Sequence, residues 1–321
     1  MRSLVIAATG LALLALAGWA GWRYLAAPPS LAPDARAALY RTPLPAPQAG
    51  MEVFHLGHSL VGRDMPAMVG QLAAAAGIHG HSHHSQLGWG TSLREHWDPA
   101  LPINGFEVEN DHSRFRDARE ALAGGVDALI VTEMIKLADA IRYHDSAQHL
   151  ANWARLARQH NPEARVYLYE TWHWWTMDDA WLERLERDAV SQWEGTILAQ
   201  AMAQDGVGTV HVIPAGRAMG AFVRELERQG GLPGLTDRRG LFGTGGDGEV
   251  DQIHLGDLGH YFVALVHLAT LYQTDPRGLP HALLRHDGTP ADAPSPEVAA
   301  LMQAVVWDVV RSLPVTGVSP T

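Results

Sequence analysis

Short apolar runs alternate with helix-like segments along most of the chain, and this alternation limits the fold more than any other feature of the sequence. Four apolar runs are strand candidates: 51–56, 126–132 (VDALIVT), 165–170 (RVYLYE) and 209–213 (TVHVI). A fifth candidate, 78–86, is a His-rich extended run of alternating character. Strands that alternate with helices form a parallel sheet covered by helices on both faces. The sequence therefore predicts a three-layer α/β/α sandwich around a parallel sheet of roughly five strands.

The segments between and after these runs carry apolar residues at helical spacing. The first expected helix covers residues 63–76, and Gly77 follows it as a C-cap. Later helices are expected up to about residue 160 after the third strand candidate, and over residues 181–203, 217–228, 258–272 and 296–313. We see no internal repeat and no second core, which favours one catalytic domain.

An uncharged segment lies near the N-terminus, between Arg2 and Arg23. Its length is close to the roughly 20 residues that span a bilayer and exceeds the usual core of a signal peptide. An uncleaved anchor is therefore favoured, although Ala26 and Ala27 leave cleavage open and a buried soluble helix is an alternative. We expect a signal anchor or signal peptide at 1–27, an Ala/Pro-rich linker at 28–50, and a hydrolase domain at 51–321 in a periplasmic or other extracytoplasmic location.

Composition excludes several functions. The net charge of -11 and the lack of any basic run argue against a nucleic-acid partner. The chain has no Cys, which excludes disulfides, thiolate zinc sites and cysteine nucleophiles. His79, His81, His83 and His84 alternate along one strand candidate, but with 18 His in the chain we assign no metal site to them. We expect no metal and no other cofactor.

Ser59 is the candidate nucleophile, because it lies between the first strand and the first helix. A hydroxyl at such a turn lies beside free backbone N–H groups and the positive end of a helix dipole. Asp251 and His254, three residues apart before a later helix, can supply a base and the carboxylate that orients it. A single Asp-x-x-His is more often a helix cap beside a surface histidine, so its pairing with Ser59 is what supports catalysis.

Together these motifs resemble the SGNH (GDSL-like) hydrolase family. Residues 57–60 (GHSL) stand where the family has Gly-Asp-Ser-Leu, and residues 251–255 (DQIHL) match its last block. The resemblance covers about residues 51–272 and implies a flavodoxin-like sandwich with a Ser59–His254–Asp251 triad. It also implies an oxyanion hole made by the Ser59 N–H and a glycine N–H, for which we favour Gly90 over Gly88.

The third family block departs from the pattern. Its usual Asn, a second oxyanion donor, is missing, and Glu133 follows the strand instead. A carboxylate cannot donate a hydrogen bond unless it is protonated, so the second donor stays open. A subgroup without this Asn, with a Thr-Trp pair after the next strand, resembles the chain more closely, since Thr171 and Trp172 occupy that place.

Three residues are candidates for substrate binding: Glu133, Trp172 and Trp89. Trp172 belongs to a stretch with three Trp in four positions, 172–175 (WHWW). Such a cluster forms either a rim that stacks on a sugar or acyl group, or aromatic packing under a loop. The sequence does not decide between the two.

The sequence as a whole predicts a serine hydrolase that acts on carboxylic esters, with O-acetyl or short acyl groups on envelope carbohydrates as the expected substrates. One alternative is a membrane-anchored carbohydrate-binding protein that keeps the fold without turnover. The other is an α/β-hydrolase, because residues 57–59 begin a G-x-S-x-G motif, although residue 61 is Val. Acyl length, the alcohol, hydrolysis against acyl transfer, anchor cleavage and oligomeric state stay open.

Overall fold

The computed structural model describes residues 28–176 and 180–320. Its centre is a parallel five-stranded sheet with the order β2-β1-β3-β4-β5. The strands are β1 Glu52–His58, β2 Ser82–Gly88, β3 Ala128–Val131, β4 Arg165–Glu170 and β5 His211–Pro214. This is the flavodoxin-like strand order, in which the chain steps outward from β1 to β2 and then restarts on the other side with β3. The predicted three-layer α/β/α sandwich is confirmed.

Both faces of the sheet are buried, as expected for parallel strands. In β4, Tyr167 and Tyr169 pack into one hydrophobic cluster, and Val166 and Leu168 pack into the other. Successive side chains of a strand point to opposite faces, so each strand contributes to two cores. This explains why central strand candidates such as 126–132 are nearly continuous apolar runs, whereas the His-rich run 78–86 forms β2 at the edge of the sheet.

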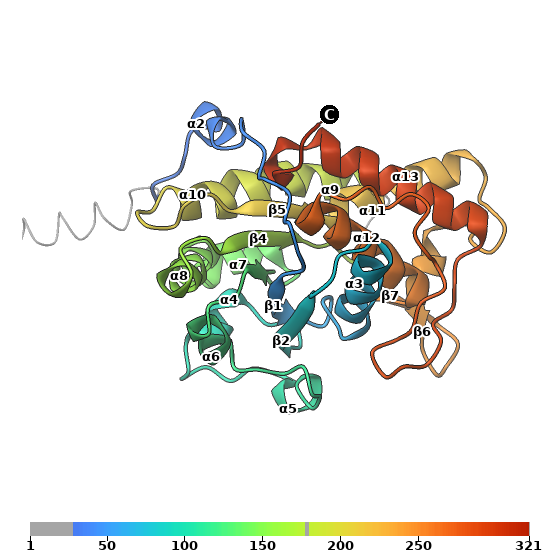
Figure 1. Cartoon of the computed structure of the whole chain (residues 1–321), viewed down its shortest axis with the longest axis horizontal. Helices are drawn as coiled ribbons and strands as arrows, with labels where there is room; N and C mark the ends of the chain where they lie inside the picture. The colour runs from blue at the N-terminus through green and yellow to red at the C-terminus, as the bar shows by residue number, and fades with distance from the viewer. Residues whose placement is uncertain (1–27, 177–179, 321) are drawn as a thin grey trace, which may run out of the picture.

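Two groups of helices cover the sheet, one on each side of the strands (Figure 1). The first group contains α3 Asp64–Ala75, α9 Trp181–Asp188, α11 Ala215–Arg228, α12 Asp257–Tyr272 and α13 Pro296–Ser312. The second contains α4 Leu93–Trp97, α6 Ala118–Ala123, α8 Ser146–His160, the π-helix η1 Ala189–Leu198 and α10 Ala199–Met202. Short elements complete the order: α5 Phe106–Glu109, α7 Leu137–Tyr143, η2 Arg238–Leu241 and η3 Pro314–Thr316.

Two expected helices differ from the sequence prediction. The long helix after β3 is broken into α7 and α8, because Asp145 between them has a left-handed backbone with φ of 51°. The helix expected over 181–203 is helical throughout but passes through the π-helical segment η1. In both cases the spacing of apolar residues predicts which face of the helix is buried. It does not predict these local changes in backbone conformation.

The segment expected as a linker, 28–50, lies against the domain. It contains the short helix α2 Pro33–Ala38, and the Leu31 N–H donates to the Ala199 carbonyl at 3.0 Å. The buried Tyr40 hydroxyl donates to the Val210 carbonyl at 2.7 Å. The packed fold therefore begins before the expected boundary at Met51, because Tyr40 completes the core on the α8 side of the sheet.

The predicted anchor or signal peptide, residues 1–27, lies outside the described residues. Within the described part of the chain, no helix has the length and apolar character required to cross a membrane.

A hairpin follows the main sheet and carries the last motif. Its strands are β6 Phe242–Thr244 and β7 Val250–Leu255, and they pair antiparallel. Asp251 and His254 therefore lie in a strand, whereas the sequence suggested a turn before a helix. The α/β-hydrolase alternative does not fit, because Ser59 follows the first strand and both partners lie on this one hairpin.

Candidate active site

Ser59 lies directly after β1, between the ends of β2 and β3. This is the point where the strand order reverses, and ligands of open parallel sheets bind in the crevice there. Gly57 allows the strand ends to approach closely, since a Cβ at this position would meet the Thr132 Cγ2 atom at 2.5 Å. A turn follows, in which the Val61 N–H donates to the His58 carbonyl at 2.9 Å, and it presents the Ser59 hydroxyl at the surface.

The hairpin brings a base and a carboxylate to this serine. The Ser59 Oγ atom lies 3.0 Å from His254 Nε2, and His254 Nδ1 lies 3.0 Å from Asp251 Oδ2. The His254 and Asp251 side chains are 50% and 38% exposed. Nucleophile, base and orienting acid thus form one hydrogen-bonded chain that is open to solvent on one side.

Residues three apart in a regular strand point to opposite faces, so Asp251 and His254 meet only because the strand is distorted. The Asp251 Oδ1 atom accepts the backbone N–H groups of Ile253 and His254, both at 2.7 Å, which tightens the chain into an Asx-type turn. Burial raises the pKa of Asp251, but these N–H groups and the His254 side chain outweigh it and lower the pKa. The carboxylate is therefore charged at neutral pH.

Two tryptophans hold this segment from behind. Trp172 donates its indole N–H to the Ile253 carbonyl at 2.8 Å, and Trp175 donates to the Asp251 carbonyl at 2.9 Å. The Trp175 backbone N–H also donates to the Gln252 carbonyl at 3.1 Å. Trp172 is 1% exposed and does not line the cleft, so the structure gives it a positioning contact to β7 in place of the expected substrate contact.

A cleft of about 800 Å³ opens over Ser59 and His254. Trp89 and Trp174 both line it, so the aromatic cluster contributes one residue to the cleft wall while two others pack behind it. Trp89 is 52% exposed and donates its indole N–H to Glu109 at 2.7 Å. The Trp89 ring lies flat on Gly105, where a Cβ would come within 2.2 Å of it. The structure therefore places Trp89 where a substrate could contact it.

The two candidate oxyanion glycines have different surroundings. Gly90 lines the cleft and has φ of 58°, a conformation that favours glycine. A Cβ at Gly88 would meet the Thr91 hydroxyl at 2.2 Å, so this position needs glycine for packing, and Gly88 does not line the cleft. Among the described residues, the N–H groups of Ser59 and Gly90 have no hydrogen-bond acceptor. Both remain free to bind an oxyanion.

Glu133 does not reach the cleft, which corrects its expected role in substrate binding. Its side chain is fully buried, and its Oε1 atom accepts the N–H groups of Met134 at 2.8 Å and Leu93 at 3.3 Å. Leu93 begins α4, directly after the loop that carries Gly90. Glu133 thus ties the end of β3 to that loop. Burial raises the pKa of Glu133 to about 7, although the Met134 and Leu93 N–H groups favour the charged form.

Replacing Glu133 with Gln is expected to change how stability depends on pH. Between the ordinary value of 4.5 and about 7, the folded protein keeps a proton that the unfolded chain has released, so wild-type stability falls as pH rises. Over this pH interval the free energy of unfolding of the wild type should fall by about 3 kcal/mol, and that of Glu133→Gln should not. Urea unfolding at pH 5 and pH 8 measures the difference, with the exposed Glu107→Gln as control. Equal pH slopes in the wild type and Glu133→Gln would contradict this assignment.

Two buried histidines, His58 and His96, hold the backbone of the nucleophile turn. His58 Nδ1 accepts the Leu60 N–H at 3.3 Å while Nε2 donates to the Glu133 carbonyl at 2.9 Å. His96 Nε2 donates to the Gly57 carbonyl at 2.7 Å. Burial lowers the pKa of each to about 4, so both are neutral at neutral pH. His58 could be noticed from its place in the motif, whereas His96 is far from it in sequence.

One group of possible metal ligands occurs among the described residues, formed by Asp64, Asp257 and His260. Its carboxylates already have cationic or hydrogen-bonding partners, since Asp257 pairs with Arg285 at 2.5 Å and Asp64 accepts from His286 at 2.7 Å. We therefore assign no metal to it. The histidines at 79–84 do not form such a group in the described part of the chain.

Comparison with known proteins provides a fold but no sequence family. No family model and no curated protein matches the chain. A DUF4886 family protein from Bacteroides uniformis superposes with a TM-score of 0.52 at 17% identity, over 81% of this chain and 95% of its own. A gut microbial diltiazem-metabolizing enzyme has a TM-score of 0.42 at 15% identity, over 72% and 48% of the two chains. A family 3 carbohydrate esterase from Talaromyces cellulolyticus has a TM-score of 0.34 at 17% identity, over 69% and 96%.

The sequence identities of these three proteins to this chain, 15% to 17%, are too low to transfer an activity to it. The function must therefore be argued from the site itself. What the first of them shows is that this chain shares the fold of the DUF4886 family protein.

Proposed function

We propose that the protein is a serine hydrolase that cleaves carboxylic esters. The observation that carries this proposal is the hydrogen-bonded chain from Ser59 through His254 to Asp251 at the floor of an open cleft. It stands at the edge of the sheet where ligands bind in folds of this class. Free N–H groups at Ser59 and Gly90 add the means to hold an oxyanion.

In this mechanism the Ser59 oxygen attacks the acyl carbon while His254 Nε2 takes the hydroxyl proton. Asp251 holds the ring through Nδ1 and stabilises the imidazolium that forms. The oxyanion accepts the N–H groups of Ser59 and Gly90. The ester C–O bond then breaks and His254 returns the proton to the leaving alcohol. Water attacks the acyl-Ser59 ester with the same base and releases the carboxylic acid.

The substrate we propose is a carbohydrate that carries an O-acetyl or other short acyl group. Trp89 and Trp174 in the cleft wall support a sugar, because indole faces stack on the apolar faces of pyranose rings. An extracytoplasmic glycan is the proposed source. This location rests on the predicted anchor or signal peptide at 1–27, through which the chain would meet the membrane.

Labelling with a fluorophosphonate probe tests the nucleophile directly. The wild type is expected to react at Ser59 and to hydrolyse p-nitrophenyl acetate, because the probe captures only a serine with a working base. Ser59→Ala should abolish labelling, whereas Ser312→Ala at the exposed end of α13 should label like the wild type. A folded wild type that neither labels nor turns over the ester would favour the non-catalytic carbohydrate-binding protein.

A further inference from the structure

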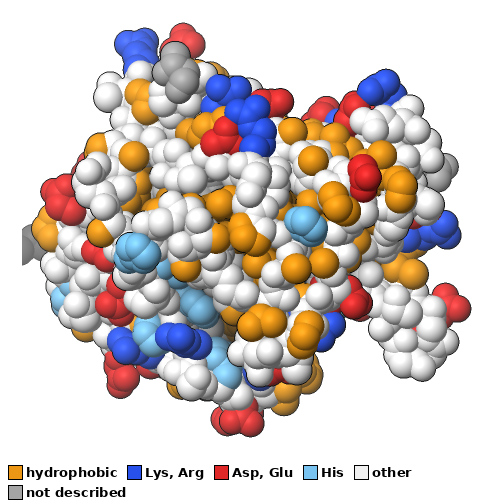
Figure 2. Space-filling model, turned by 45° about the vertical axis from the view of Figure 1, so that its right-hand side comes forward, with side chains coloured by type: hydrophobic (Ala, Val, Ile, Leu, Met, Phe, Trp, Pro, Cys, Tyr) orange, Lys and Arg blue, Asp and Glu red, His pale blue; other side chains and the backbone are white. Residues whose placement is uncertain are grey.

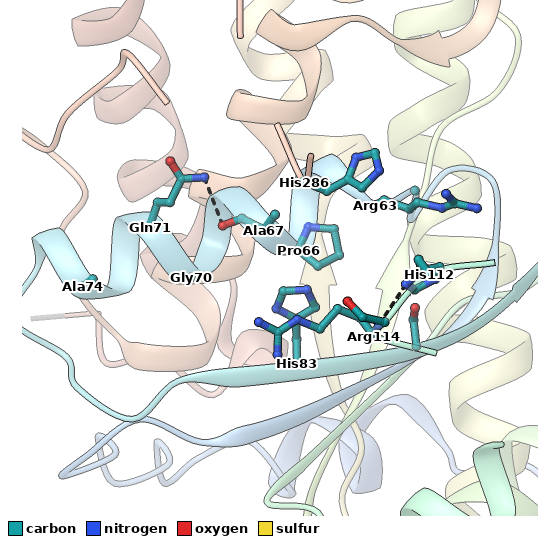
Figure 3. A pocket seen from close by; sticks show the side chains of 13 residues that line it. Arg63, Pro66, Ala67, Gly70, Gln71, Ala74, His83, His112, Arg114 and His286 are labelled. Atoms are coloured by element: carbon teal, nitrogen blue, oxygen red, sulfur yellow. Dashed lines mark hydrogen bonds between the residues drawn. The ribbon is translucent and has the colours of Figure 1, made fainter. Parts of the chain in front are cut away.

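A second cavity of about 450 Å³ adjoins the catalytic cleft. Its walls come from α3, from β2 and from the segment 112–114, and Figure 3 shows these elements around it. Gly62, Arg63 and His286 line both this cavity and the catalytic cleft, so the two share a wall. We call it the side cavity. A substrate bound over Ser59 could extend into it.

The side cavity is basic in a protein that is acidic overall. Its lining contains no Asp or Glu but includes two arginines, Arg63 and Arg114. Three histidines also line it: His83, His112 and His286, the last paired with Asp64 at 2.7 Å. The chain as a whole carries a net charge of -11. Figure 2 shows that histidines gather with Lys or Arg side chains in one region of the surface. Two arginines without a lining carboxylate make the cavity a candidate for an anionic group.

Neither arginine has a carboxylate partner among the described residues. Arg63 donates to the backbone carbonyl of Val108. The Arg114 guanidinium has no hydrogen bond or ion pair with any described residue, and its side chain extends beside His83 in Figure 3. By contrast, Arg116, two residues further along the chain, pairs with Glu52 at 3.5 Å. The paired N–H groups of the Arg114 guanidinium are therefore available to donate hydrogen bonds to a ligand.

The arginines also affect the pKa values of two histidines in the lining, His83 and His112. Burial, then Arg63 and His286, lower the pKa of His112, and burial, then His81 and Arg114, lower the pKa of His83 to about 3. The His112 Nε2 atom is buried and makes no hydrogen bond of good geometry in the described part of the chain, although a contact with the Glu109 backbone partly opposes the lowering of the His112 pKa. Both histidines are neutral hydrogen-bonding groups at neutral pH, so the charge that attracts an anion comes from the two arginines.

We propose that the side cavity binds an anionic group of the substrate, so that the preferred ester lies on a negatively charged sugar. This inference rests on the proposed hydrolase function and specifies its substrate class. A carboxylate, phosphate or sulfate shares the required chemistry, since each accepts paired N–H groups from a guanidinium. Pro66 and Ala67 on the α3 side offer an apolar surface for the ring that carries the anion.

The test compares mono-O-acetyl methyl glucuronosides with the matched glucosides, which differ only in the carboxylate at C6. Wild-type kcat/KM is expected to be at least about tenfold higher for the charged esters. Arg114→Gln should lower the charged-to-neutral ratio about tenfold, and raised salt should lower it too. Arg116→Gln, which removes the same charge two residues away and outside the cavity lining, should leave the ratio unchanged.

To identify the preferred anion, kcat/KM is also measured for the acetylated glucosides that carry a 6-phosphate or a 6-sulfate. A higher kcat/KM for either of them than for the neutral ester supports the proposal equally. A wild-type ratio near one, or an equal ratio in Arg114→Gln and the wild type, would overturn it. A dependence on acyl length without dependence on charge would also overturn it, since the side cavity would then be an acyl pocket. Because turnover of the neutral esters reports the hydrolase function separately, failure of either proposal can be recognised.

Discussion

Replacing His254 with Ala is expected to lower kcat for p-nitrophenyl acetate by about 10³- to 10⁶-fold. His254 is the described residue whose ring nitrogen reaches the Ser59 hydroxyl, at 3.0 Å, so its loss leaves the nucleophile without a base. The neighbouring carboxylate cannot replace it, because Asp251 is held by the N–H groups of Ile253 and His254. Steady-state kinetics and the rate of fluorophosphonate labelling should fall together.

The matched control for this variant is His160→Ala, at the exposed end of α8. It removes one histidine far from the cleft and should keep wild-type turnover. Added imidazole should restore part of the activity of His254→Ala, because the base is then supplied from solution. Ester hydrolysis by His254→Ala at the wild-type rate would refute the mechanism.

Replacing Arg217 with Met is expected to lower the free energy of unfolding by about 3–5 kcal/mol. Arg217 lies 2.8 Å from Glu170 and 2.7 Å from Glu194, and all three side chains are nearly buried. Burial raises the pKa of Glu170 even with Arg217 present, so removal of the cation leaves two buried acids without a counter-charge. Chemical denaturation measures the loss, and thermal unfolding should shift by roughly 10 °C.

Arg224 provides the comparison, because it lies on the same helix α11 and also pairs with two glutamates, Glu183 and Glu186. These pairs are partly exposed, so Arg224→Met should cost less than about 1 kcal/mol. The reverse order of the two losses would show that burial does not decide the strength of these pairs. Glu170 ends β4 and precedes the segment with Trp172 and Trp175, so Arg217→Met should also lower esterase activity.

Local sequence determined the elements and the class of the fold. Each strand of the sheet must be apolar on both faces, and each helix apolar on one, so the periodicity of residues such as 165–170 and 217–228 is sufficient to locate them. The order of strand, turn and helix also singles out Ser59. These properties depend on neighbours in the chain, and a sequence displays them directly.

Only the tertiary structure decided how the site is assembled. Asp251 and His254 lie in β7, and the Asx-type turn and the indoles of Trp172 and Trp175 hold them toward Ser59. The same packing buries Glu133 behind the Gly90 loop. The side cavity takes its lining from segments that no local pattern connects, those around residues 63, 83, 114 and 286. Contacts between residues far apart in the sequence depend on which surfaces the folded layers bring together. The spacing of apolar residues along the chain does not specify those contacts.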